Sequence, residues 1–281
     1  FSMYITYATF VINSNDKKTK GVRLYSLRDI FERIASGAKI KGDLALRTLE
    51  VCSNNKGCNP RSAKGYRDYL VAYIDEEHKV HRLTKATNEN KYVVMFVNAT
   101  YDIGGVKCNT SIRVPPSGVI KVSVGLSSQN EINVSRGSDG ALNNLVEKMT
   151  NDVLKMLGIK QIRPTKLVSM NTEGYNIFNK NGNTPDFKIM NLGGIMSMLA
   201  NELKTHYFAY NEREGKSVPR EFLKPLEQGK HPTISITNRG NVGMSGATSI
   251  RQLVSVTGAL QSAFDPLETR VEKSFDVPPA K

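Results

Sequence analysis

Long apolar runs are missing from this sequence of 281 residues. No stretch of eighteen apolar residues occurs, so no segment has the length and hydrophobicity of a membrane-spanning helix. The N-terminal stretch YITYATFVINSND alternates in polarity and lacks the charged start and continuous apolar core of a signal peptide. We therefore expect a soluble, intracellular protein without a membrane partner.

Cysteine and histidine are scarce, with three and four residues respectively. An odd number of cysteines is more typical of a reducing compartment than of a disulfide framework. Cys52 and Cys58 are separated by five residues, and His78 and His81 by two. Zinc sites usually have two to four residues between cysteines and three to five between histidines, so the spacing argues against a metal site. We expect free thiols and surface imidazoles here.

The common catalytic motifs are also absent. The chain has no Gly-x-Ser-x-Gly, no His-Glu-x-x-His and no Gly-x-x-x-x-Gly-Lys sequence, which excludes the usual nucleophile, zinc and phosphate-loop signatures. We expect a protein that is not an enzyme and that has no cofactor.

Basic residues are in excess, because 39 Lys and Arg stand against 26 Asp and Glu, for a net charge of +13. Such an excess favours binding to a polyanion such as nucleic acid. A solvated basic surface, a membrane surface or an acidic protein remain alternatives, since charge alone does not distinguish among anions.

Two segments, 119–158 and 233–264, follow the same pattern. Each begins with a strand-like alternation, in which Ile120, Val122 and Val124 form one face of the first segment. Each then reaches a turn, at 125–130 and at 238–241, alternates again and continues into an amphipathic helix. The pattern predicts two diverged copies of one α/β unit.

Matching material precedes each copy. Residues 3–14 and 165–178 read as strands, and 26–36 and 190–203 read as amphipathic helices. The predicted organisation is a first repeat over 1–160 with an insertion at about 41–90, a second repeat over 161–266, and a C-terminal tail over 267–281. Residues 181–185 and the tail are expected to be exposed loops.

This order resembles the TATA-box-binding protein (TBP) family, whose repeats each contain a strand, a short helix, four strands and a long helix. In the second copy, 236–247 (ITNRGNVGMSGA) keeps the family's turn glycine as Gly240 and its Gly-Ala pair before the long helix. Residues 170–174 (MNTEG) match the family's Asn-x-x-Gly strand, and 217–219 (SVP) stand where it has Leu-Phe-Pro. The long insertion resembles the divergent versions of large DNA viruses.

The resemblance implies an α+β fold with two pseudo-symmetric repeats, in which helices cover a saddle of curved antiparallel sheet. The family inserts two phenylalanine pairs into the minor groove and kinks the duplex. The matching positions here are aliphatic or polar, and Glu173 replaces a DNA-facing valine, so weak or absent kinking is expected. The candidate DNA-contacting residues are Asn171, Val218, Thr237, Arg239, Val122, Val124, Thr9 and Val11.

Two functions follow as alternatives. The first is a DNA-binding, TBP-like factor for promoter recognition and transcription initiation, which binds double-stranded DNA and contacts transcription proteins through its helices. It would act as a monomer with an internal pseudo-dimer, in the nucleus, a cytoplasmic virus factory or a virion. The second is a structural or assembly protein of a virion or nucleoprotein that keeps the fold without specific DNA reading.

Overall fold

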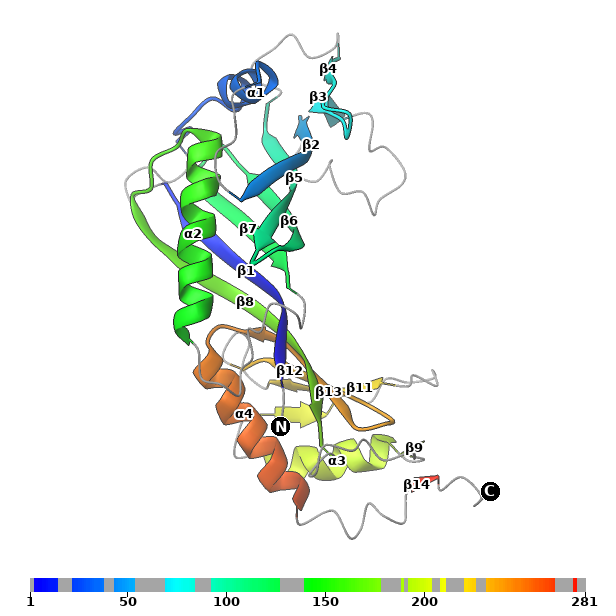
Figure 1. Cartoon of the computed structure of the whole chain (residues 1–281). Helices are drawn as coiled ribbons and strands as arrows, with labels where there is room; N and C mark the ends of the chain where they lie inside the picture. Colours follow the sequence, from blue (N-terminus) through cyan, green and yellow to red (C-terminus); the bar gives the residue numbers. More distant parts are fainter. Residues whose placement is uncertain are drawn as a thin grey trace. The chain divides into compact units, whose positions relative to one another are not determined.

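Antiparallel strands and four helices alternate along the part of the chain that the computed structural model describes (Figure 1). The described residues are 3–14, 22–37, 43–53, 69–83, 92–126, 139–177, 188–189, 192–203, 208–210, 220–225, 231–265 and 275–276. None of the helices there has both the length and the apolar character needed to span a membrane. The fold class is α+β.

The chain divides into two compact units, which differ from the predicted repeats at their boundaries. The first unit comprises Ala8–Asn130 and Ala141–Leu167. The second comprises Phe1–Tyr7, Glu131–Gly140 and Val168–Lys281.

The first unit is a mixed arrangement of an antiparallel sheet and two helices. Its elements are β1 (Tyr4–Asn13, from Ala8 onward), α1 (Leu27–Ala35), β2 (Leu44–Cys52), β3 (Leu70–Ile74), β4 (Val80–Arg82), β5 (Val94–Ile103), β6 (Val106–Val114), β7 (Val119–Gly125) and α2 (Asp139–Leu157, from Ala141 onward). The strands lie in the order β1-β7-β6-β5-β2-β3-β4.

Helix α2 covers one face of this sheet. Tyr101 on β5 is 1% exposed, and its hydroxyl donates to Asp152 Oδ2 on α2 over 3.1 Å. Cys108 on β6 lies opposite Tyr101. Cys108 and Ile112, four residues further along β6, are both buried. Because side chains alternate across a strand, the intervening residues of β6 lie on the other face, where no described helix covers them and all four are exposed: Lys107, Asn109, Ser111 and Arg113.

Helix α1 begins where the sequence predicts. Ser26 is its N-cap and accepts from the Asp29 backbone N–H, which satisfies one of the unpaired donors at a helix start. The expected apolar stripe is buried and consists of Leu27, Ile30, Phe31 and Ile34. Arg33 donates to the Met156 carbonyl, which ties α1 to α2.

The second unit is also an antiparallel sheet with two helices packed on one face. Its elements are β8 (Arg163–Asn176, from Val168 onward), α3 (Leu192–Glu202), β10 (Phe208–Tyr210), β11 (Arg220–Pro225), β12 (Thr233–Thr237), β13 (Asn241–Ala247) and α4 (Ile250–Phe264). The strand order is β10-β11-β12-β13-β8. Tyr175 on β8 donates to Gln261 Oε1 on α4, and both Tyr175 and its cross-strand neighbour Val242 are buried.

The strands and helices expected at 3–14, 26–36, 165–178 and 190–203 are confirmed as β1, α1, β8 and α3. The hairpin expected in the first copy is not. Strand β7 is flanked by β6 and β1, so no position beside it is open to a return strand after residue 125. Its hairpin partner is β6, and the connecting turn ends at Gly118, whose φ is +88°.

The insertion predicted at about 41–90 also needs correction. β2 lies within that range but pairs with β5 as part of the main sheet. The described remainder, β3 and β4, forms a hairpin that extends the sheet at the β2 side. His81 on β4 stacks on Tyr73 at 4.3 Å and pairs with Asp75 at 2.6 Å, and Arg82 Nε donates to Glu32 Oε1 at 3.2 Å.

The C-terminal tail contains a short strand instead of loop alone. β14 (Phe275–Asp276) pairs with β9 (Lys188–Ile189) in a separate two-stranded sheet. The predicted loop at 181–185 lies outside the described residues.

Candidate nucleic-acid interface

A hollow of about 530 Å³ lies on the face of the second unit's sheet that is opposite its helices. We call the face on which no described helix packs, in either unit, the open face. The hollow is lined by Thr6, Asn171, Thr172, Glu173, Gly174, Ser235, Thr237, Asn241, Val242, Gly243, Met244 and Ser245. Strands β8, β12 and β13 therefore supply almost all of its wall.

Two glycines explain why the sheet is hollow at this place. Gly243 lies opposite Ser235, and a Cβ at position 243 would come within 2.9 Å of Ser235 Oγ. The β8–β13 register shifts between Val242 and Met244, and Gly174 beside the shift has a φ of +97°. A bulge in one strand and a missing side chain in the other leave the concavity.

The wall of the hollow is rich in neutral hydrogen-bonding groups. Amides come from Asn171 and Asn241, and hydroxyls from Ser235, Thr237 and Ser245. Hydroxyls and amides both donate and accept, so this surface can match the edges of bases or of other polar ligands. Glu173 adds a single exposed carboxylate, and none of the twelve lining residues is basic.

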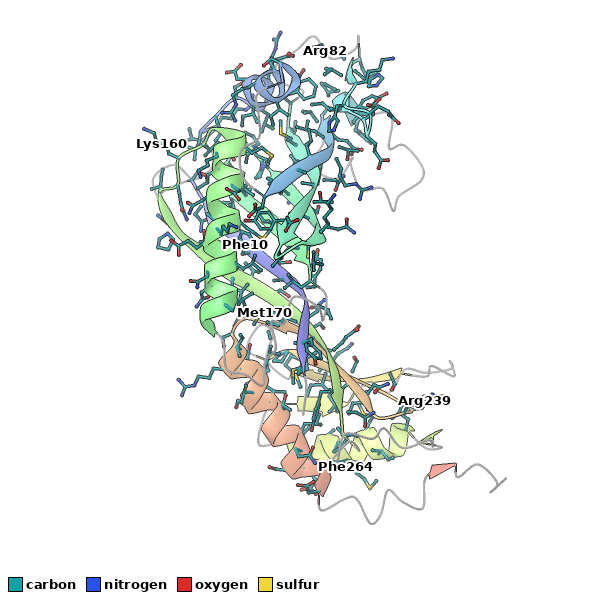
Figure 2. The ribbon with its side chains drawn as sticks, in the orientation of Figure 1. Phe10, Arg82, Lys160, Met170, Arg239 and Phe264 are labelled. Atoms are coloured by element: carbon teal, nitrogen blue, oxygen red, sulfur yellow. The ribbon has the colours of Figure 1, made fainter. Side chains whose placement is uncertain are left out.

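The turn beside the hollow is fixed by side chains. Asn176 Nδ2 donates to the Arg239 carbonyl over 2.9 Å and to Asn241 Oδ1 over 2.8 Å. Thr237 Oγ1 accepts from the Asn241 backbone N–H over 3.1 Å, and Gly240 has a φ of +79°. Figure 2 shows Arg239 in this turn, where its side chain is exposed. The turn thus holds one cation at the end of the hairpin.

A row of small polar side chains crosses the open face of the first unit. Cross-strand pairing places Thr48, Asn98, Ser111 and Ser123 in register on β2, β5, β6 and β7. Asn98 Nδ2 donates to Thr48 Oγ1 over 2.9 Å, and the hydroxyls of Ser123 and Thr9 lie 3.0 Å apart. This row is neutral across five strands.

Basic side chains lie two residues away from that row along β6 and β7. Arg113 on β6 and Lys121 on β7 are directly opposite each other, and both are exposed. Two like charges side by side repel, so this pair is stabilised when an anion approaches it. The open face of the first unit therefore joins hydroxyl and amide groups to a basic pair.

The predicted contact residues fall into three groups. Asn171 and Thr237 line the hollow, and Arg239 stands in the turn next to it. Thr9 and Val11 alternate with the buried Phe10 and Ile12, which places them on the open side of β1, although Thr9 is only 4% exposed.

The third group requires correction. Val122 and Val124 are 0% and 1% exposed and lie on the helix-covered side, so the open side of β7 is formed by Lys121 and Ser123 instead. Val218 lies outside the described residues. The polar residues Ser235, Ser245, Arg113 and Lys121 were not predicted, although the strict alternation of their strands could have revealed them.

No metal-binding group occurs among the described residues, where no cluster of three His, Cys, Asp or Glu side chains is found. Cys52 is disulfide-bonded, so the expectation of a thiol at this position is wrong. Cys108 is a buried thiol, and burial raises its pKa above the ordinary value.

No family model matches the chain, and no curated protein matches it significantly. Among solved structures, it is similar to one described as Methanococcus jannaschii TBP, with 12% sequence identity and a TM-score of 0.38. The likeness covers 95% of this chain and 99% of the other.

Proposed function

We propose that the chain is a TBP-like DNA-binding factor built from two diverged repeats. Its role would be promoter recognition or transcription initiation, without catalysis. One observation carries the proposal: in each unit, helices pack on one face of the sheet while the other face presents hydroxyl and amide groups.

The chemistry of the two open faces supports contact with a duplex. Asn171 and Asn241 have amides that can donate to base acceptors, and the Ser and Thr hydroxyls can donate or accept. Arg113 and Lys121 provide cations for phosphates, as does Arg239 in the second unit. The net charge of +13 favours association with a polyanion of any sequence.

Strong kinking of the duplex is not part of the proposal. Thr237, at the position that matches one of the family's wedges, has a short polar side chain that cannot unstack bases as an aromatic ring does. The carboxylate of Glu173 would also repel nearby phosphates. We therefore propose weakened or absent kinking.

Glu173 supports a second candidate function. A carboxylate at a hollow that has no basic lining residue is unfavourable for a DNA-binding face, and it suits a protein partner better. The alternative is an assembly or structural protein of a virion or nucleoprotein that has kept the fold. In either function, the helices would contact protein partners.

The two functions can be separated with the full chain and fluorescently labelled AT-rich and GC-rich duplexes of equal length. Affinity is measured at two salt concentrations, with energy transfer between the duplex ends as the readout of bending. Promoter recognition predicts tighter binding to one composition at both salt concentrations. Equal binding with a steep salt dependence would overturn promoter recognition and leave only charge-driven association. Absence of binding would overturn both promoter recognition and charge-driven association with DNA.

A further inference from the structure

A second hollow, of about 340 Å³, lies in the first unit around the start of helix α1. It is lined by Arg23, Leu24, Tyr25, Ser26, Leu27, Arg28, Tyr92 and Pro116. Its volume is within the range of small-molecule sites. The lining combines two guanidinium groups with two phenol rings and contains no carboxylate.

The wall of this hollow is held in place by contacts to the β6–β7 turn. The Leu24 backbone N–H donates to the Pro116 carbonyl over 2.9 Å. The Tyr25 hydroxyl donates to the Pro115 carbonyl over 2.5 Å, and the ring is partly buried. These two bonds fix the segment before α1, so the hollow does not depend on a ligand for its shape.

The charges around the hollow favour an anion. Arg23 and Arg28 are exposed at its wall. Glu32, which is not among the lining residues, accepts two hydrogen bonds from Arg82, and the guanidinium groups of Arg82 and Arg28 both lower the pKa of its carboxyl group. Ser26 already caps the Asp29 N–H, so the cationic character comes from the arginine side chains and not from the helix start.

Guanidinium groups bind phosphate oxygens in a bidentate manner, and tyrosine rings offer flat apolar surfaces on which a base can stack. We propose that this hollow binds a nucleoside 5′-monophosphate, either as a free nucleotide or as the phosphorylated 5′ end of a strand. Arg23 and Arg28 hold the phosphate, and Tyr25 and Tyr92 line the place of the base. The proposal does not depend on how the open faces act.

The test is a calorimetric titration of the full chain with adenosine monophosphate, adenosine and inorganic phosphate. The monophosphate is expected to bind more tightly than either part alone, because the site has one group of residues for each part. Arg23→Gln and Arg28→Gln are each expected to weaken binding about tenfold, the usual effect of losing a charged hydrogen bond. Arg251→Gln changes an exposed arginine on α4 and is expected to leave binding unchanged.

Two further arms complete the experiment. A 5′-phosphorylated oligonucleotide that binds more tightly than its 5′-hydroxyl counterpart identifies a strand end as the source, and binding of the free nucleotide alone identifies a metabolite. Both results support the proposal. Thermal unfolding of each variant shows whether its fold is retained, and Arg23→Gln serves if Arg28→Gln is unstable. The proposal is overturned if adenosine monophosphate does not bind, if inorganic phosphate or adenosine binds equally well, or if folded arginine variants bind like the parent.

Discussion

Gly243 and Ser235 face each other across β12 and β13, and the Ser235 hydroxyl donates to the Gly243 carbonyl over 3.3 Å. A methyl group at position 243 would lie 2.9 Å from Ser235 Oγ, inside ordinary contact distance. This contact makes the depth of the hollow depend on one absent side chain.

Replacing Gly243 with Ala should therefore fill part of the hollow. The serine hydroxyl must turn away and lose its bond to the carbonyl, at a cost to the free energy of unfolding of about 1 kcal/mol. Under the proposed function, DNA affinity should fall several-fold. Urea unfolding and duplex titration measure the two effects.

Two controls separate filling from destabilisation. A Cβ at Gly258 in α4 would meet no atom within 4 Å. Gly258→Ala should therefore raise the free energy of unfolding by about 0.5–1 kcal/mol through helix propensity, and it should leave DNA affinity unchanged. The double variant Ser235→Ala/Gly243→Ala should recover the stability that Gly243→Ala loses, but it should not recover the DNA affinity. If the double variant binds DNA like the parent, the hollow is not part of the DNA contact.

Glu173→Gln removes the carboxylate from the edge of the hollow. Under the proposed function it should raise duplex affinity about three- to tenfold at low salt, because one repulsion between charges is lost. Filter binding at two salt concentrations would detect the change. Glu202→Gln, an exposed change at the end of α3, is the matched control. Unchanged affinity in the Glu173 variant would favour the assembly function.

Arg113→Gln and Lys121→Gln remove the basic pair from the open face of the first unit. Each should reduce the slope of log affinity against log salt by about one if its side chain contacts a phosphate. Lys155→Gln removes an exposed charge from α2, on the covered side, and should reduce the slope less. If the slope of log affinity against log salt is the same in all three variants, the duplex does not contact the Arg113–Lys121 pair.

Alkaline pH should unfold the protein through buried phenols. Burial raises the pKa of Tyr175 to about 12 from its ordinary value of 10.0, and burial also raises the pKa values of Tyr25 and Tyr101. The unfolded chain therefore loses these protons first, and the free energy of unfolding falls as pH rises from about 10 toward 12.

Urea unfolding at pH 8, 10 and 11 measures this dependence, and absorbance at 295 nm follows phenolate formation. Tyr175→Phe loses its bond to Gln261 at every pH, yet it should show a smaller decline in stability between pH 10 and pH 11 than the parent. An equal decline would mean that Tyr175 does not titrate in that window.

Much of the fold could be predicted from local periodicity. The stripe of Leu27, Ile30 and Ile34 is buried in α1 as its spacing indicates. The second hairpin was found because Gly240 marks its turn. Strand β6 was missed, since Cys108 and Thr110 occupy buried positions where strongly apolar residues usually mark a strand.

Missing β6 had a direct effect on the site. The strand of Val122 and Val124 was matched to that of Thr237, although β7 takes the place beside β1 that β13 takes beside β8. Because the side-chain period of a strand is two, an error in matching strands transfers residues to the wrong face. Asn171, whose motif lies within one strand, lines the hollow. The hollow itself depends on Gly243 opposite Ser235 in the β12–β13 hairpin and on the irregular pairing of β13 with β8, a strand far away in the sequence.

The outermost strand of the first unit, β4, is only three residues long and carries His81 and Arg82, which are engaged with Asp75 and Glu32. A strand of another molecule arriving at this edge would find few backbone groups to pair with, and it would have to displace the contacts of His81 with Asp75 and of Arg82 with Glu32. Short and charged edges are poor templates for fibril growth. The β3–β4 hairpin therefore protects a sheet with an uncovered face against aggregation along this edge.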